Sequence, residues 1–324
     1  MGELLAVASA LCFGTTHFLN GLVSRDRHGV TVAACAQAGG TVVSLVPVLL
    51  TQGADAPPSA LGWGALSGLG TGVGVACLYW SMNRGPMSVV VPVSDVTAVG
   101  LPVLAGIALL GDRPSPPALT GIALGLPALW LVSRGSRGGS REPSRPHEPR
   151  GPRVPYEARP GPGPGHAPGF GSGHAPGHGP GHGPGADRLR PAVVLALVAG
   201  VGLALHFFAL ARIPASAGWW PVVVSRAVSV AVILALLPAT GASLRLPRRA
   251  AAVAAVAGAL GTLATILYLL ATRQELLSVA VVLSALYPAV PVLLALTFLR
   301  ERITRPQAVG LLGAGLAIGL IALN

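Results

Sequence analysis

Four ionisable side chains lie inside long apolar runs of the sequence, namely His17, Asp95, His206 and Arg226. An ionisable group within a membrane span costs about 2.5 to 3.5 kcal/mol on insertion scales, so such groups face the protein interior or a wet cavity. Carboxyl and imidazole groups there suit proton transfer, and a guanidinium suits an anion or a carboxylate partner. We therefore expect a pathway for a proton or a small solute.

Asp95 is the centre of this expectation because it lies near the middle of its apolar run, at mid-depth if the run is a helix rising 1.5 Å per residue. Two interpretations stay open. In the first, Asp95 alternately holds a proton and releases it for the solute. In the second, Asp95 and Arg226 form a fixed ion pair that joins two helices and keeps Asp95 ionised. Arg226 is then either this partner or an anion-binding group.

Other polar residues within the apolar runs complete the candidate pathway. His17 and His206 are interpreted as cavity relays, and the alternative for each is a satisfied packing residue. Tyr79 and Tyr268 are interpreted as solute-facing or gating aromatics, and the alternative for each is an anchor at the membrane interface. Prolines at 92, 102, 288 and 291 predict interrupted helices in both halves of the chain, which would free backbone carbonyls near a transport site. The remaining candidate residues are Tyr287, Ser284, Pro288 and Pro291.

The elements that hold these residues are predicted to be membrane helices. Of the 324 residues, 52% are hydrophobic and 10% are charged, whereas soluble domains carry about 25% charged residues. A soluble enzyme is therefore excluded, and about 20 apolar residues suffice for one crossing. Ten spans are predicted, at 3–23, 29–50, 60–82, 87–110, 116–133, 191–212, 215–237, 249–272, 276–299 and 306–323.

An internal duplication links the two sets of five spans. At one offset of 189 residues, His17-Phe18 aligns with His206-Phe207, Tyr79 with Tyr268, Arg84 with Arg273 and Gly121 with Gly310. The same offset aligns Asp95 with Ser284. Because each unit has an odd number of spans, the second copy must enter the membrane in the opposite orientation. The fold class predicted is an all-α membrane protein with two inverted five-helix repeats, and its site lies where the repeats meet.

The chain divides into a first repeat at 1–133, a linker at 134–190 and a second repeat at 191–324. The linker holds 15 Gly and 12 Pro among 57 residues, a composition that predicts disorder. Its histidines His166, His174, His178 and His182 are weak candidates for metal binding. The three cysteines, Cys12, Cys35 and Cys77, show no paired spacing and are interpreted as core residues.

The second half resembles a known family. It carries Leu267-Tyr268, Arg273, Ser278, Leu286-Tyr287-Pro288, Pro291, the run Leu299-Arg300-Glu301-Arg302-Ile303-Thr304, Gln307 and Gly310. This pattern is similar to the drug/metabolite transporter superfamily, EamA type, and the first half resembles it more loosely. The resemblance implies a ten-helix carrier of small metabolites or drugs, often an exporter. Arg226 matches an arginine often found in the second helix of such a unit, and Gln37 stands there in the first copy.

The charges indicate orientation. All 22 basic residues are arginines, and the net charge is +11. Arginines following spans 1, 3, 7 and 9 outnumber those on the opposite side, and nine more lie in the linker. The positive-inside rule then predicts a cytoplasmic linker with both termini outside. The family resemblance more often implies cytoplasmic termini, so the two lines of reasoning disagree.

We therefore expect a multi-pass protein of the cell (cytoplasmic) membrane, a secondary transporter that moves a small metabolite or drug-like solute by alternating access, with proton coupling as an option. The expected partners are the solute and the lipid bilayer, without nucleic acid, and the chain is a monomer or a homodimer. No enzyme activity and no cofactor are expected. The alternatives are a flippase for lipid-linked head groups or a membrane assembly protein, and a divalent-metal carrier supplied by the linker histidines.

Overall fold

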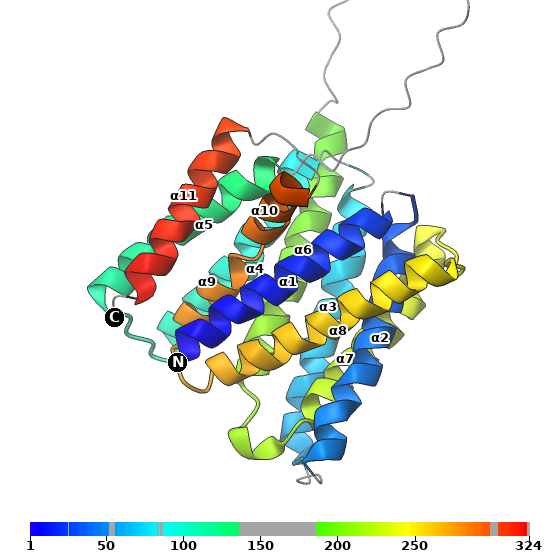
Figure 1. The fold of residues 1–324 in the computed structure, drawn as a ribbon, viewed down its shortest axis with the longest axis horizontal. Coiled ribbons are helices and arrows are strands. Elements are labelled where there is room, and N and C mark those ends of the chain that lie inside the picture. Colours follow the sequence, from blue (N-terminus) through cyan, green and yellow to red (C-terminus); the bar gives the residue numbers. More distant parts are fainter. Residues whose placement is uncertain are drawn as a thin grey trace, which may run out of the picture.

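The structure, a computed structural model, describes residues 1–24, 26–51, 56–82, 84, 87–135, 186–298 and 304–322. The described residues form helices and no strand (Figure 1). The helices are α1 (Gly2–Ser24), α2 (Gly29–Leu50), α3 (Pro58–Met82), α4 (Met87–Leu109), α5 (Pro116–Gly135), α6 (Ala186–Ala211), η1 (Ala215–Ala217, a short 3-10 helix), α7 (Trp220–Thr240), α8 (Arg248–Ala271), α9 (Leu277–Ala285), α10 (Ala289–Phe298) and α11 (Arg305–Ala322).

Length and composition make this an all-α membrane protein. Within the described residues, seven helices, α1 to α4 and α6 to α8, are long and apolar enough to cross a membrane. Helices α5 and α11 contain shorter apolar stretches, Pro116–Val132 and Arg305–Ile321. Helix α6 begins at Ala186, before the span predicted at 191.

The two halves pack as an inverted repeat. Helices α5 and α11 lie side by side at one edge of the bundle (Figure 1). A Cβ added at Gly121 would lie 2.9 Å from the Ala317 carbonyl oxygen, and one added at Gly310 would lie 2.9 Å from the Ala128 carbonyl oxygen. These are two equivalent contacts, since 121 corresponds to 310 and 128 to 317. The equivalent helices therefore run antiparallel and meet across a pseudo-twofold axis.

The prediction of interrupted helices was correct for the second repeat and wrong for the first. Residues 286–288 separate α9 from α10, and the bonds there are of the i to i+3 type, from Ala289 N to Leu286 O and from Val290 N to Tyr287 O. Helix α4 instead continues through Pro92 and Pro102. Those two prolines are ten positions apart, so each removes one backbone hydrogen bond from a different turn. Pro288 and Pro291 act on adjacent turns and also disfavour helical backbone in the residues before them.

The predicted start of the seventh span at 215 is wrong. Residues Ala215–Ala217 form the 3-10 helix η1, and Gly218 follows with a φ of +61°. This positive φ ends the short helix and turns the chain into Trp219, which precedes α7. The segment at 215–219 is therefore a structured connection between α6 and α7 rather than the first turn of a span.

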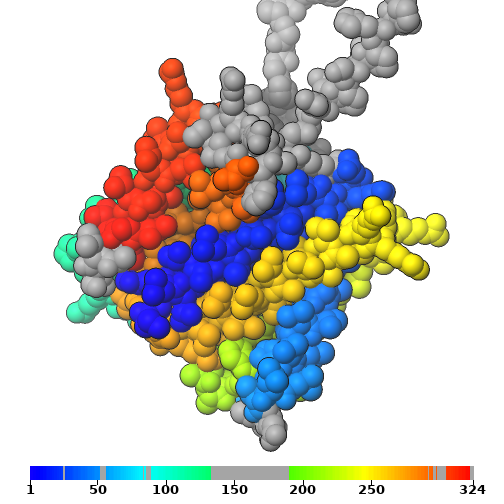
Figure 2. Space-filling view, viewed as in Figure 1, coloured from blue at the N-terminus to red at the C-terminus, as the bar shows by residue number. Residues whose placement is uncertain are grey.

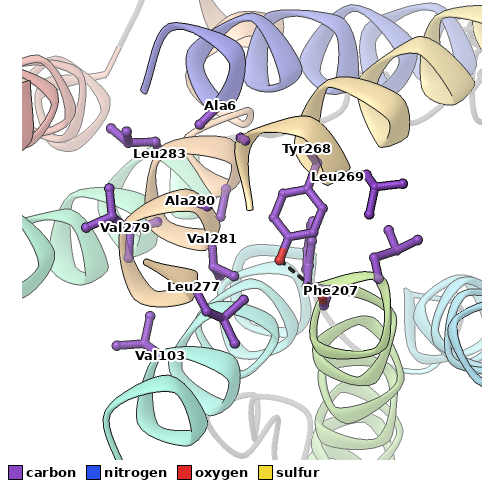
Figure 3. Close-up of a cluster of buried hydrophobic side chains, with 14 of the residues drawn as sticks. Ala6, Val103, Phe207, Tyr268, Leu269, Leu277, Val279, Ala280, Val281 and Leu283 are labelled. Carbon is purple, nitrogen blue, oxygen red and sulfur yellow. Dashed lines mark hydrogen bonds between the residues drawn. The ribbon is translucent and has the colours of Figure 1, made fainter. Parts of the chain in front are cut away.

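The bundle has two ends. The terminal end holds the start of α1, the end of α4, the start of α9 and the end of α11 (Figure 1). The linker end holds the end of α5, the start of α6 and the start of α2. The largest apolar cluster includes Ala6, Val103, Phe207, Tyr268 and Leu283 (Figure 3) and joins helices at the terminal end. Across the face shown in Figure 2, α1 packs along α8.

Candidate functional site

Asp95 lies opposite the break between α9 and α10. The side chain of Asp95 is 4% exposed, and the Tyr287 hydroxyl donates a hydrogen bond of 3.1 Å to its Oδ1. His17 of α1 stacks on the Tyr287 ring, with ring centroids 4.7 Å apart and planes inclined by 16°. His17 itself is exposed. The structure thus brings together a carboxyl group, a phenol and an imidazole that the sequence places 78 and 192 residues apart.

A series of aromatic rings connects this group to the terminal end. The ring centroids of Tyr287 and Phe13 lie 6.3 Å apart, and those of Phe13 and Phe207 lie 6.1 Å apart. Phe207 and Tyr268 meet edge to face at 5.0 Å, and the Tyr268 hydroxyl donates a 3.0 Å hydrogen bond to the Phe207 carbonyl oxygen (Figure 3). Tyr268 is fully buried and belongs to the largest apolar cluster, so this series of rings ends in packed protein.

His206, the repeat equivalent of His17, lies in a separate polar cluster. Its side chain is 6% exposed, and its Nδ1 lies 2.8 Å from Ser67 Oγ and 2.7 Å from Thr71 Oγ1, both on α3. The Ser67 hydroxyl lies a further 3.0 Å from Ser225 Oγ on α7. His206 is thus hydrogen-bonded to one neighbouring helix, whereas His17 stacks on the broken span. The two equivalent histidines therefore have different surroundings.

Arg226 forms a third cluster on the pseudo-twofold axis. Its Nη1 donates a 2.6 Å hydrogen bond to Gln37 Oε1, and its Nη2 donates to the Gly261 carbonyl oxygen at 2.5 Å and to the Thr265 hydroxyl. The acceptors around the guanidinium come from α2 and α8, and Asp95 of α4 is not among these three hydrogen-bond partners. The Asp95–Arg226 ion pair stays a prediction from the sequence.

The other predicted positions contribute to structure around the site. Ser284, the repeat equivalent of Asp95, is fully buried and donates a 3.3 Å hydrogen bond to the Ala6 carbonyl oxygen. Pro288 is buried and lies in the break between α9 and α10, next to the Tyr287 that contacts Asp95. The side chain of Pro291 lies outside the described part of the structure. Tyr79 packs beside Val30 and Ile233 at the linker end.

Several residues of these clusters were not predicted from the sequence. Ser67, Thr71, Ser225 and Thr265 are small hydroxyl residues in apolar helices, and such residues usually bond to their own helix. Thr71 also donates to the Ser67 carbonyl oxygen one turn earlier. Gln37 is the exception, because its alignment with Arg226 in the repeat could have identified a contact across the axis.

Arginines border both ends outside the spans. Arg212 lies over the Trp63 ring at 5.8 Å, and Arg273 over the Trp219 ring at 5.8 Å. Burial lowers the pKa of the Arg273 guanidinium from its usual value. At the linker end, Arg84 lies over the Trp80 ring at 4.6 Å. These contacts fit the role of arginine and tryptophan at membrane interfaces.

In the part of the chain that the structure describes, no group of three or more His, Cys, Asp or Glu side chains is placed to hold a metal ion. The linker histidines His166, His174, His178 and His182 lie outside the described residues. A metal-carrier function therefore stays a hypothesis from the sequence. Cys12, Cys35 and Cys77 are free thiols.

The helical fold and the buried polar groups at the repeat interface define an integral membrane protein of the transporter type. The profile of the EamA-like transporter family matches residues 1–134 and 190–323. The chain belongs to this family and is a membrane transporter of small solutes. No curated protein matches the chain. One solved structure, titled only "Crystal structure of protein", is similar with a TM-score of 0.65 and 18% identity, over 99% of this chain and 95% of that chain, which supports the fold alone.

Proposed function

We propose that this transporter exports a small metabolite or drug-like solute across the cytoplasmic membrane by alternating access, in exchange for protons that bind at Asp95. The observation that carries the proposal is the hydrogen bond from the Tyr287 hydroxyl to Asp95 at the only interrupted span among the described residues. Interrupted helices at a repeat interface are typical of the sites that bind solutes and coupling ions.

In this mechanism Tyr287 positions Asp95 and His17 conducts the proton. The Tyr287 hydroxyl can donate to the ionised carboxylate, so it favours the charged form when the solute is absent. The stacked His17 ring is not enclosed by protein, and in this mechanism it passes protons between Asp95 and water. Protonation of Asp95 would remove the negative charge of its carboxylate. A solute group that is held by this carboxylate would then be released.

The arginine distribution supports an orientation for this cycle. Arg27, Arg84, Arg245, Arg248 and Arg249 lie at the linker end, whereas Arg113, Arg212 and Arg273 lie at the terminal end. We take the linker end as cytoplasmic by the positive-inside rule. Export then carries solute from the linker end to the terminal end.

The test measures proton release in everted vesicles given pooled amino acids, nucleobases, organic cations and divalent metals. We expect solute-evoked proton release from the wild-type protein, loss of the release in Asp95→Asn, and a reduced rate in Tyr287→Phe, which lacks only the hydroxyl. Asp26→Asn, the same change at an exposed loop position, is the matched control and should behave as the wild type. Proton release that persists in Asp95→Asn would move the coupling to the histidines.

One observation favours a second candidate function. An apolar groove lies between α4 and α6, lined by Leu101, Pro102, Ala105, Val201, Ala204, Leu205 and Phe208. A lipid acyl chain fits such a lateral surface, so a flippase for lipid-linked head groups is the alternative. Lipid movement in vesicles together with no response to any soluble pool would favour it over solute export.

A further inference from the structure

Arg226 is a buried charge for which the described residues provide no opposite charge. Its side chain is 7% exposed, and its three hydrogen-bond acceptors are an amide, a backbone carbonyl and a hydroxyl. All three are neutral. Neutral oxygens satisfy hydrogen-bonding capacity, but they leave the net charge of a guanidinium in a membrane interior uncompensated. A purely structural tie between helices would not require an arginine here.

The position of Arg226 in the repeat places it at mid-depth. Arg226 and Gln37 are 189 residues apart, which is the repeat offset, and their side chains touch at 2.6 Å. Two equivalent positions can contact each other only near the pseudo-twofold axis. In an inverted repeat this axis lies in the plane of the membrane, where solute sites of such transporters are found. The uncompensated charge thus lies at the centre of the repeat interface.

The surroundings of Arg226 also adjoin the Asp95 group. Gly261, which accepts from Arg226, lies beside Thr16 of α1, since a Cβ added at Gly261 would be 3.6 Å from Thr16 Oγ1 and 3.9 Å from Arg226 Nη1. Thr16 precedes His17, which stacks on Tyr287. Two consecutive residues of α1, Thr16 and His17, therefore adjoin the Arg226 cluster and the Asp95 group respectively.

We infer that Arg226 is the binding group for an anionic moiety of the transported solute, such as a carboxylate or a phosphate. This inference rests on the proposed function and adds the chemical class of the solute. The planar guanidinium suits either anion through paired hydrogen bonds. Gln37, Gly261 and Thr265 orient it from α2 and α8, so the solute would complete the charge balance on binding.

The first measurement needs no solute. If Arg226 awaits an anion, a permanent carboxylate beside it should stabilise the empty protein. In lipid nanodiscs, the full chain carrying Gln37→Glu should melt about 3 °C or more above the wild type. Gln274→Glu, the same substitution at an exposed position after α8, is the matched control and should not produce this rise. A Gln37→Glu protein that melts at or below the wild-type temperature would overturn the inference, because the charge would already be compensated.

The second measurement uses charge-matched probes. Benzoate and inorganic phosphate at high concentration are compared with neutral benzamide by their effect on the melting temperature. We expect at least one anion to raise the melting temperature of the wild type while benzamide does not, and Arg226→Gln and Gln37→Glu to lose the response. Arg226→Lys should retain part of it, and Arg212→Gln should retain all of it. An equal response in Arg226→Gln, or no response to either anion in the wild type, would contradict the inference.

These readouts separate the inference from the proposed function. Melting temperatures do not depend on proton coupling, so an anion response that survives in Asp95→Asn supports the Arg226 assignment even if Asp95 carries no protons. Conversely, proton release that requires Asp95 but not Arg226 would uphold the coupling site and reject the anionic solute.

Discussion

The two ends of the bundle hold equivalent residues of the repeat in different surroundings. At the terminal end Phe207 is 5% exposed, and Leu210 and Tyr268 are fully buried. Their equivalents at the linker end are Phe18, Gly21 and Tyr79. Phe18 and Tyr79 are partly exposed, and Gly21 is exposed with nothing within 4 Å of an added Cβ. The three residues at the terminal end are therefore packed against protein, whereas their equivalents at the linker end are not fully covered.

This difference indicates the conformation that the structure holds. In alternating access, one repeat takes the arrangement that the other has just left, so the two ends exchange their packing. The linker end is also hollowed between the loops at 26–28 and 243–246. We therefore interpret the structure as open toward the linker end, with Phe207 and Tyr268 closing the terminal end. In the opposite state, Phe18 and Tyr79 would close the linker end.

The largest expected effect compares the two equivalent tyrosines. Tyr268→Ala removes a fully buried ring and the hydrogen bond to the Phe207 carbonyl, and such large-to-small changes cost about 3 to 5 kcal/mol. Tyr79→Ala removes a partly exposed ring and should cost less than half as much. Chemical unfolding in mixed micelles measures both. Equal losses would mean that the ends are equally packed and would remove the basis of the comparison.

Chemical access gives the second test. In a chain with Cys12, Cys35 and Cys77 replaced by Ala, single cysteines are introduced as Gly21→Cys and Leu210→Cys. A sulfonated maleimide should modify the first at least about tenfold faster, because a fully buried thiol reacts only when the structure opens locally. Adding a transported solute should bring the ratio of the two modification rates closer to one, because the two ends then exchange their packing. A ratio near one without solute would contradict the assigned conformation.

Much of this architecture was predictable from the sequence because apolar length, the 189-residue offset and arginine placement each report directly on membrane topology. The helical class and the family were confirmed. The break at Tyr287 and Pro288 was also predictable, since two prolines lie within adjacent turns. The continuity of α4 was not, because two prolines nearly three turns apart leave the intervening hydrogen bonds to hold the helix together.

The partners of the ionisable residues were less predictable. The sequence placed Asp95 and Arg226 in apolar helices but could not choose between pairing and separation, because that depends on helix rotation. In the structure, α2 and α8 satisfy Arg226 and the broken ninth span supplies Tyr287 to Asp95. Repeat symmetry could have predicted the Gln37–Arg226 contact. It could not have predicted the different partners of His17 and His206, since their neighbours on α3 and α8 differ in sequence.

A smaller effect is expected at Gly21. Gly21→Ala should stabilise the open structure by about 0.5 to 1 kcal/mol, since alanine is favoured in a helix and nothing contacts the added methyl group. If the linker end must close over Gly21, the same change should slow transport while the protein becomes more stable. Gly68→Ala is the contrasting control, because its Cβ would lie 2.9 Å from Val228 Cβ. Faster transport in Gly21→Ala would argue against closure at this position.

The smallest effect concerns the helix caps at equivalent positions on opposite ends. Gln307 Oε1 accepts a 2.9 Å hydrogen bond from Thr304 N at the start of α11, near the linker end. In the first repeat, Ser115 Oγ accepts a longer 3.4 Å bond from Ala118 N at the start of α5. Ala118 stands where Gln307 stands in the second copy, so α5 lacks the side-chain acceptor that Gln307 provides at the start of α11.

We expect Gln307→Ala to cost about 0.5 kcal/mol or slightly more, and Ser115→Ala to cost less, as measured by chemical unfolding. The reason for the order is geometric, because the shorter bond satisfies a backbone N–H that otherwise has no partner in the first helical turn. When a helix moves between conformational states, its contacts with other helices change. A capping hydrogen bond between residues at its own start is kept, so it stabilises the helix in every state. A larger loss of unfolding free energy for Ser115→Ala than for Gln307→Ala would contradict the expected order. It would mean that α5 depends more on its cap than α11 does.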